Sequence, residues 1–374
     1  MDKIFVKIIK YTLLFLLIFI KNSYAQSLET ILKNSESELI SYVYSNQEKF
    51  EVQIILTELK KRGKSFTIHK KKFNSDKNNY FYPASSIKLP IALLTIEKIN
   101  ESSDLNINSE FSIQGDSIIT TFKKEITDLF IISSNESYNR LFEFLGQDYI
   151  NEKLKQKGFK DFSISHRLST KESDNLKTKE INFYSNGEIY QIQKSIKNKP
   201  VSKLNLKNLN KGIGFISNNK LQNKPMDFSR KNYFSINELN NILICLFFPE
   251  ISKNKKFNLS KSQNFLIKKL MSSTPFEMGF NKNKYPNNYN KFFIYGDKNG
   301  MINDNIFNKV GNAYGYSIDN AYIYNKNSDR HFVLTACIYT NANNILNDNN
   351  YEYDEIGIPF LAEIGRLLTG YNIR

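Results

Sequence analysis

Residues 82–94 read Tyr-Pro-Ala-Ser-Ser-Ile-Lys-Leu-Pro-Ile-Ala-Leu-Leu, a loop that runs into an apolar helix and carries Ser85 and Lys88. At this spacing the two side chains lie on one face of a helix, one turn apart. A serine hydroxyl is a weak nucleophile, and a lysine can take its proton once burial or nearby cations lower the lysine's pKa. The stretch is therefore a candidate acyl-transfer site, although the pattern alone is also typical of a helix start with an exposed lysine.

The first 25 residues have the pattern of a secretory signal peptide. Lysines precede an uncharged run from Tyr11 to Ile20, and small residues follow at Ser23 and Ala25. The run is too short to span a bilayer comfortably. We expect cleavage and export to the periplasm or beyond, with no stable membrane insertion afterwards; a retained membrane anchor is the alternative.

Composition narrows the classes of function. The chain has 374 residues, 40% of them hydrophobic, which suffices for one large domain or two intimate ones. Its net charge of +15 falls to +12 when residues 1–25 are removed, because they hold four lysines and Asp2. The lysines are scattered among asparagines along the chain, which is typical of a solvated basic surface. Together with export, this argues against a nucleic-acid partner.

The sequence contains few residues that could bind a metal or form a disulfide. Cys245 and Cys337 each lie inside an apolar run, which favours two buried thiols over a bridge, although an exported protein could form one. The three histidines, His69, His166 and His331, show no ligand spacing. We therefore expect no metal site and no cofactor.

Hydrophobic periodicity predicts strands at both ends of the chain and helices between them. Strands are expected at 51–59, 65–69, 306–314, 320–325 and 331–339, with a turn at 315–319. Helices are expected at 27–50, from Ser85 onward with a bend at Pro90, at 121–133, 137–145, 146–158, 235–248 and 260–272, and around 360–368. Residues 160–229 are polar and predict long loops with a few short elements.

This order predicts an α/β fold of the α+β kind. An antiparallel sheet built from both chain ends, with flanking helices, would carry an inserted all-helical subdomain. We expect one domain over residues 26–374, with the sheet part at about 26–99 and 290–374 and the helical part at about 100–289.

Two further motifs follow the first in order. Ser133-Ser134-Asn135 separates two predicted helices, and Lys309-Val310-Gly311 lies on a predicted strand. With Ser85-Ser86-Ile87-Lys88, they resemble the Ser-Asp-Asn, Lys-Thr-Gly and Ser-x-x-Lys elements of class A β-lactamases and penicillin-binding proteins. The two-ended sheet around a helical insertion is also that superfamily's architecture, so the resemblance covers most of the chain.

The resemblance implies catalytic roles for four residues. Ser85 would attack a carbonyl carbon and form an acyl-enzyme, and Lys88 would accept its proton. Ser133 would relay a proton to the leaving nitrogen. The class A loop that carries the deacylating glutamate is similar to the stretch from Arg167 to Glu172, which makes Glu172 the candidate base, with a plain surface carboxylate as the alternative.

The resemblance also implies a substrate-binding set of Asn135, Lys309, Gly311 and Asn312. Asn135 would bind Lys88 and the substrate amide, and Lys309 would lower the pKa of Lys88 and attract an anionic substrate. The backbone N–H groups of Ser85 and Asn312 would form an oxyanion hole next to Gly311. Val310 departs from the family pattern, because it stands where a hydroxyl residue helps to bind the carboxylate of a β-lactam.

These observations together indicate an exported serine hydrolase that acts on an amide, with a β-lactam as the first expectation. A D,D-peptidase, an amidase or an esterase with the same nucleophile is the alternative within enzymes. From another class, the alternative is a catalytically idle domain that binds peptidoglycan fragments or senses them. The expected partner is a small-molecule or peptide amide substrate, and the sequence leaves the oligomeric state open.

Overall fold

The computed structural model describes residues 26–63, 65–252, 255–298, 305–326 and 328–370. The predicted signal peptide, residues 1–25, lies outside the described residues, so its prediction stays a prediction. Within the described ranges, no helix is long and apolar enough to cross a membrane.

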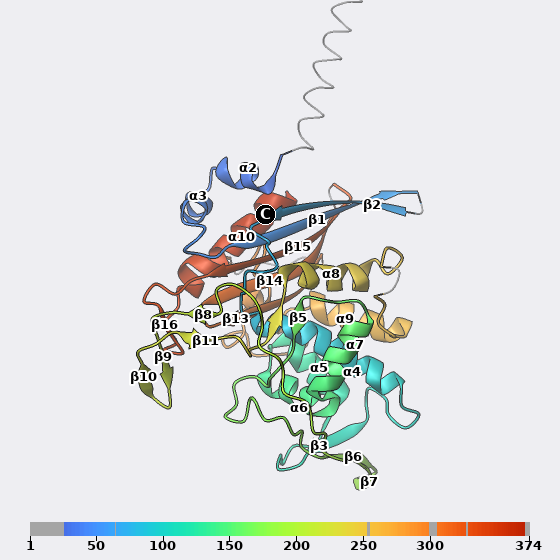
Figure 1. The fold of residues 1–374 in the computed structure, drawn as a ribbon. Helices are drawn as coiled ribbons and strands as arrows, with labels where there is room; N and C mark the ends of the chain where they lie inside the picture. Colours follow the sequence, from blue (N-terminus) through green and yellow to red (C-terminus); the bar gives the residue numbers. More distant parts are fainter. Residues whose placement is uncertain (1–25, 64, 253–254, 299–304, 327, 371–374) are drawn as a thin grey trace, which may run out of the picture.

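A five-stranded antiparallel sheet joins the two ends of the chain (Figure 1). Its order is β13 (Ile306–Ala313), β14 (Tyr316–Asn325), β15 (Arg330–Tyr339), β1 (Gln53–Arg62) and β2 (Ser65–Phe73). The predicted two-ended sheet is confirmed. The predicted turn at 315–319 is too long, because Gly315, with a φ of +84°, makes a tight turn and the strand resumes at Tyr316.

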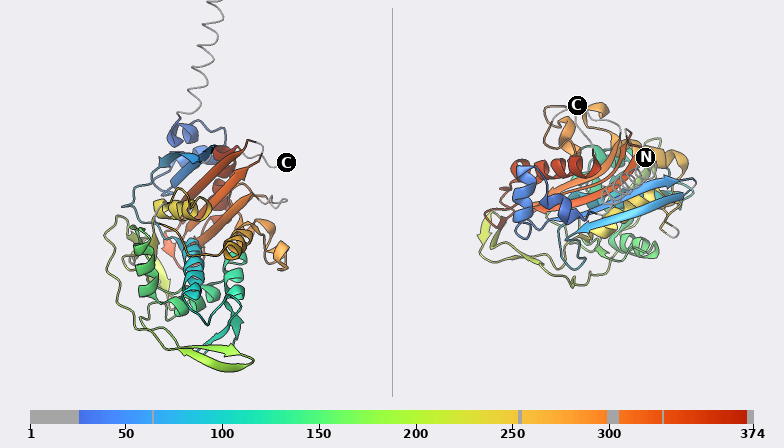
Figure 2. Two further views of the ribbon diagram at one scale, coloured as in Figure 1. Left: turned by 90° about the vertical axis from the view of Figure 1, so that its right-hand side faces the viewer. Right: turned by 90° about the horizontal axis from the view of Figure 1, so that it is seen from above.

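One face of the sheet is covered by α2 (Leu28–Lys33), α3 (Glu38–Ser45) and α10 (Ile358–Thr369) (Figures 1 and 2). The single helix predicted over residues 27–50 is wrong. Ser27 and Ser37 each accept a backbone N–H with the side-chain oxygen, from Thr30 and Ile40, and so begin two separate helices. Short polar residues between apolar positions preserve the helical period while interrupting the helix itself.

The other face packs on α8 (Ile236–Phe247), which a buried polar network ties to the sheet. Asn240 accepts from Thr57 Oγ1 at 2.7 Å and donates to Val333 O and Thr335 Oγ1, both at 3.1 Å. Asn320 donates to Leu239 O at 2.9 Å and accepts from Thr335 Oγ1 at 2.7 Å. These polar groups are all satisfied, so the helix and three strands are held in one arrangement.

The helical part lies between the two sheet segments of the sequence. It contains α4 (Lys88–Asn100), α5 (Phe122–Ile131), α6 (Asn135–Leu145), α7 (Gln147–Gln156) and α9 (Lys261–Ser272). Almost every side chain of α4 is buried. The helix lies in the hydrophobic core of the helical part, which is separate from the core beneath α2, α3 and α10. Pro90 lies in the first turn of α4, where a backbone N–H is not needed, rather than in the second turn where we expected a bend.

Short strands fill the remainder of the chain, and both thiols are buried. A four-stranded sheet combines β4 (Thr120–Thr121), β3 (Glu110–Ile113), β6 (Ile181–Ser185) and β7 (Glu188–Gln193). Small pairings involve β5 (Phe162–Ser163) with β12 (Tyr233–Phe234), β8 (Asn210–Lys211) with β11 (Met226–Asp227), and β10 (Lys220–Gln222) with β9 (Gly214–Ser217) and β16 (Ile345–Leu346). The expected short elements within 160–229 are therefore present.

Cys245 and Cys337 are buried and free, as predicted.

The network around Asn240 predicts a large stability cost for Asn240→Leu. The substitution would remove the acceptor of the buried Thr57 hydroxyl and the bonds donated to Val333 O and Thr335 Oγ1, which costs about 3 kcal/mol in the free energy of unfolding. Urea unfolding followed by circular dichroism measures this cost. The neighbouring Asn241→Leu is the control, since Asn241 is half-buried, its Oδ1 accepts from the exposed Lys70, and Glu238, to which it donates, also accepts from Lys160 N and Lys255 Nζ. An equal loss of stability in both variants would contradict the role of the network.

Candidate active site

Ser85 lies on the short 3-10 helix η1 (Ala84–Ile87), directly before α4, and its side chain is half-buried. Strand β13 passes beside this turn at Gly311. A Cβ at Gly311 would lie 2.5 Å from Ser85 N and 2.9 Å from Ala84 Cβ, which is closer than such atoms approach. The missing side chain therefore lets the sheet contact the backbone of the turn, and the strand brings Lys309 toward α4.

Lys88 begins α4 and is fully buried at the junction of the sheet and the helical part. Its Nζ donates to Asn135 Oδ1 at 2.8 Å, to Ser133 Oγ at 3.3 Å and to Ser133 O. Burial lowers the pKa of Lys88 well below its usual 10.5, and the charge of Lys309 lowers it further, while Glu136 acts in the opposite direction. The Lys88 amine therefore loses its proton more readily than an exposed lysine does, as a proton acceptor must.

Lys309 completes a chain of polar contacts with the same groups. Its Nζ donates to Ser133 Oγ at 2.8 Å and to Val310 O at 3.0 Å. Burial lowers the pKa of Lys309 to about 7, with Asp319 acting to raise it and Lys291 to lower it. The Ser133 hydroxyl therefore lies between two buried amines.

A second buried hydrogen-bond network contacts β13 through Asn308. Lys291 Nζ donates to Asn308 Oδ1 at 2.8 Å, and Asn308 Nδ2 donates to Asp319 Oδ1 at 2.9 Å. Burial lowers the pKa of Lys291 to about 7 and raises that of Asp319 to about 6. Nothing in the sequence signalled this network, because Lys291 lies in a polar, asparagine-rich stretch that is typical of a surface loop.

Several residues around Ser85 have left-handed backbone conformations without being glycine. Ala84, Ser133 and Ser169 have φ values of +46°, +54° and +50°. Such conformations cost of order 1–3 kcal/mol each and persist where the surrounding structure imposes them, commonly at functional sites. The strain gathers around one place, since each of these residues borders a cavity next to Ser85.

The structure brings Ser85, Lys88, Ser133, Asn135 and Lys309 together through the contacts above. Gly311 and Asn312 lie on β13, where Gly311 contacts the turn of Ser85. Asn312 lines the two cavities that Ser85 borders. Among the described residues, no hydrogen bond joins the Ser85 hydroxyl to Lys88, whose bonds go to Ser133 and Asn135. Catalytic hydrogen bonds are often long without substrate and tighten when it binds.

Glu172 is not brought into this group. It is exposed and lines a different cavity, which Ser85 does not border. In its place Ser169 Oγ accepts from Asn135 Nδ2 at 2.9 Å and borders the Ser85 cavity. The similarity of residues 167–168 to the class A loop suggested a base nearby, but Ser169 and Thr170 line the Ser85 cavity and Glu172 does not.

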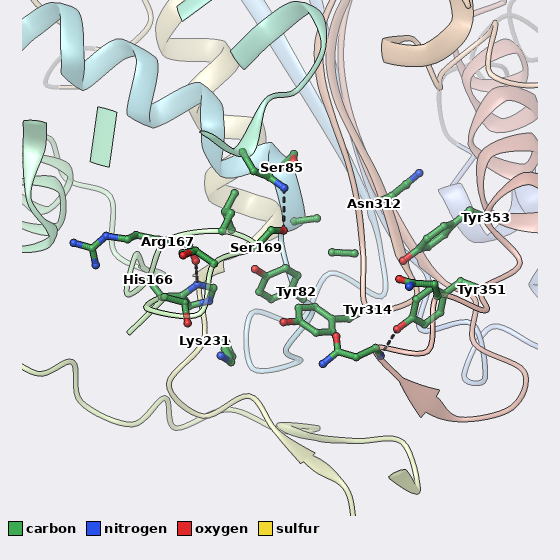
Figure 3. A pocket seen from close by; sticks show the side chains of 18 residues that line it. Tyr82, Ser85, His166, Arg167, Ser169, Lys231, Asn312, Tyr314, Tyr351 and Tyr353 are labelled. Atoms are coloured by element: carbon green, nitrogen blue, oxygen red, sulfur yellow. Dashed lines mark hydrogen bonds between the residues drawn. The ribbon is translucent and has the colours of Figure 1, made fainter. Parts of the chain in front are cut away.

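Ser85 borders a cavity of about 450 Å³ whose wall is rich in tyrosine. Four tyrosines line this tyrosine cavity, and Figure 3 shows them grouped on one side of Ser85: Tyr82, Tyr314, Tyr351 and Tyr353. The rings of Tyr82 and Tyr314 are 4.8 Å apart and perpendicular. Lys231 and His166 lie on the opposite side of the view, and His166 is stacked on Tyr82. The tyrosines come from distant segments, so their meeting had no local signal in the sequence.

A second cavity, of about 480 Å³, borders Ser85 together with Ser133. It is lined by Tyr289, Phe292, Val310 and Asp354, and we call it the Asp354 cavity. Within the described part of the chain, no cluster of histidine, cysteine and carboxylate side chains could hold a metal ion. The arrangement is suited to nucleophilic attack by Ser85 with proton transfer through amines and a hydroxyl.

Comparison with known proteins gives the family. The model of the "Beta-lactamase enzyme family" matches residues 36–371, whereas a search of curated proteins returned no match. A class A beta-lactamase structure from Bacteroides cellulosilyticus DSM 14838 is 11% identical and has a TM-score of 0.52, with 92% of this chain and 98% of that chain covered. A beta-lactamase structure from Burkholderia ambifaria is 10% identical with a TM-score of 0.53, covering 90% and 100%. At these identities the structures show a shared fold.

The contacts of Lys309 predict the pH dependence of Ser85 reactivity. A fluorophosphonate probe should label Ser85 faster as pH rises through the pKa of Lys88, because only the neutral amine accepts a proton. Lys309→Gln removes a neighbouring positive charge, which raises the pKa of Lys88, so the acid limb should move up by about one pH unit. Labelling rates measured across the pH range test this shift.

Lys231→Gln is the matched control for this experiment. Lys231 lines the tyrosine cavity but is not among the groups that shift the pKa of Lys88. Its variant should keep the acid limb of the unaltered protein. An acid limb that stays in place in Lys309→Gln, or moves equally in both variants, would contradict the electrostatic role of Lys309.

Proposed function

The chain belongs to the beta-lactamase enzyme family, and we propose that it is a serine hydrolase in which Ser85 opens an amide through an acyl-enzyme. The observation that carries the proposal is the burial of Lys88, whose amine lies among Ser133, Asn135 and Lys309. A lysine held this way has the lowered pKa that a general base for a serine needs. Lys309, a second buried lysine, also donates to the Ser133 hydroxyl. A lysine with a purely structural role would not need such a neighbour.

The proposed acylation step uses groups of this chain alone. Ser85 Oγ attacks the carbonyl carbon of the amide while Lys88 Nζ takes the hydroxyl proton. The C–N bond then breaks as the proton passes from Lys88 through the Ser133 hydroxyl to the leaving nitrogen, and the amine departs. The N–H groups of Ser85 and Asn312 stabilise the oxyanion, a contribution of about 3 kcal/mol per donor.

Release of the acyl group from Ser85 is expected to differ between linear amides and β-lactams. No carboxylate lines the tyrosine cavity among the described residues, and Glu172 lies elsewhere. We infer that water reaches the acyl group from the Asp354 cavity and is activated by the Ser133 hydroxyl, which contacts Lys88. A linear amide vacates that cavity when its amine departs, whereas the amine of an opened β-lactam stays tethered to the acyl group and obstructs water.

This argument favours a second candidate function beside β-lactam hydrolysis. A D,D-peptidase, amidase or esterase would release a linear acyl group readily and would be held by β-lactams as a long-lived adduct. What supports this candidate is the position of Glu172, away from Ser85. We propose acylation by β-lactams in either case, with slow release of the product.

Intact-mass analysis over time, with a panel of β-lactams, tests the proposal. We expect a covalent adduct on Ser85 that forms within minutes and decays slowly, because Glu172, the carboxylate expected as the deacylating base, lines neither of the cavities that Ser85 borders. Ser85→Ala should abolish the adduct while leaving thermal unfolding nearly unchanged. Absence of any adduct would overturn the proposal and leave the idle binding or sensor domain.

Glu172→Gln separates the two candidates in the same assay. Because Glu172 is exposed and outside the Ser85 cavities, the variant should keep the adduct lifetime of the unaltered protein. A lifetime prolonged tenfold or more would identify Glu172 as the deacylating base after all. Ser169→Glu is the complementary variant, since it would add a carboxylate next to Asn135 and should shorten the lifetime.

A further inference from the structure

Ser85 stands where two cavities meet. The tyrosine cavity, of about 450 Å³, and the Asp354 cavity, of about 480 Å³, share Ser85, Asn135 and Asn312 in their linings. A bound substrate can therefore extend to both sides of the bond that Ser85 attacks. Each cavity is large enough for a small ligand group of its own.

The Asp354 cavity has a negative end. Among the described residues that line it, Asp354 is the one charged side chain, and it is exposed. Val310 contributes a buried apolar side chain with no hydroxyl, next to Phe292 and Ile358. The nearby Lys309 amine is engaged by Ser133 and Val310 O. An anionic group placed here would meet a carboxylate and find no hydroxyl at position 310 to bind it.

The tyrosine cavity has the opposite character. Its described lining contains no carboxylate, and its two cations are Arg167 and Lys231. Arg167 is committed to a buried pair with Glu143, at 2.6 and 2.9 Å. Within the described ranges, the one ion pair of Lys231 is with Asp174, at 3.9 Å, and the Asp174 side chain is 73% exposed. Lys231 is therefore able to bind an anion, and the tyrosine rings offer flat surfaces for a cyclic group.

The proton donor decides which half of the substrate enters which cavity. Ser133 lines the Asp354 cavity and not the tyrosine cavity. In the proposed acylation step Ser133 gives its proton to the leaving nitrogen, so the amine half lies on the Asp354 side. The acyl half then lies in the tyrosine cavity.

We propose that the substrate is an amide with an ordered charge distribution: a neutral or cationic amine half beside Asp354, and a cyclic or anionic acyl half beside Lys231 and the tyrosines. This inference rests on the proposed function, since it names the substrate class of the same site. It separates the site from one suited to small β-lactams, whose ring carboxylate belongs to the amine half.

A matched pair of β-lactams tests the order of charges. One carries the free ring carboxylate, and the other has that carboxylate converted to a primary carboxamide. The rate at which each forms an adduct on Ser85, measured by intact mass, should be about three- to tenfold higher for the carboxamide, because a screened like charge is removed. In Asp354→Asn the carboxylate compound should speed up by a similar factor and the carboxamide should not change.

The possible outcomes separate the inference from the proposed function. Adducts from both compounds, with the carboxylate preferred or with no effect specific to Asp354→Asn, would overturn the charge order and leave the function standing. If neither compound forms an adduct, the proposed function itself is overturned. Asp354 is exposed, so its variant should fold, and thermal unfolding checks this.

Lys231→Gln tests the acyl half independently. A β-lactam with an additional carboxylate on its acyl side chain should acylate this variant about three- to tenfold more slowly than it acylates the unaltered protein. The same β-lactam without that carboxylate should be unaffected by the substitution. An equal change for both compounds would contradict a role of Lys231 in binding the acyl half.

Discussion

The burial of the Lys88 amine is the constraint on which the rest of the structure depends. A charged ammonium in such a place is costly unless it is compensated, and the molecule supplies acceptors from Ser133 and Asn135 rather than a carboxylate. Burial therefore lowers the pKa of Lys88, and this lowered pKa is what the proposed role of Lys88 as the base for Ser85 requires. Gly311 makes this possible, because the sheet can approach the turn of Ser85 only where no side chain intervenes.

Much of the architecture could be predicted because it follows from patterns that are local in the sequence. The β-rich run at 331–339 and the helical periodicity at 235–248 and 260–272 marked elements that the structure confirms. The helix over 27–50 was wrong because a capping serine at 37 interrupts a stretch whose apolar spacing continues across the break. Tight turns such as that at Gly315 depend on a backbone angle that periodicity does not encode.

The site was partly predictable for a similar reason. Ser85 and Lys88 are neighbours in sequence, whereas Ser133 and Lys309 joined them only through a motif order that resembled a known family. Residues that meet through tertiary packing, such as the tyrosines of the cavity and the Lys291 network, gave no local signal. The carboxylate expected at Glu172 lines another cavity, because the path of a loop depends on backbone angles that residue spacing does not encode.

The most direct test of the account is the pKa of Lys88 itself. Protein labelled with ¹³C at the lysine Cε, with the Lys88 signal assigned by its loss in Lys88→Met, allows the amine to be titrated by NMR. The account predicts that the Lys88 amine titrates well below the usual 10.5. A Lys88 signal that stays protonated up to that value or beyond would contradict the central role of the buried amine.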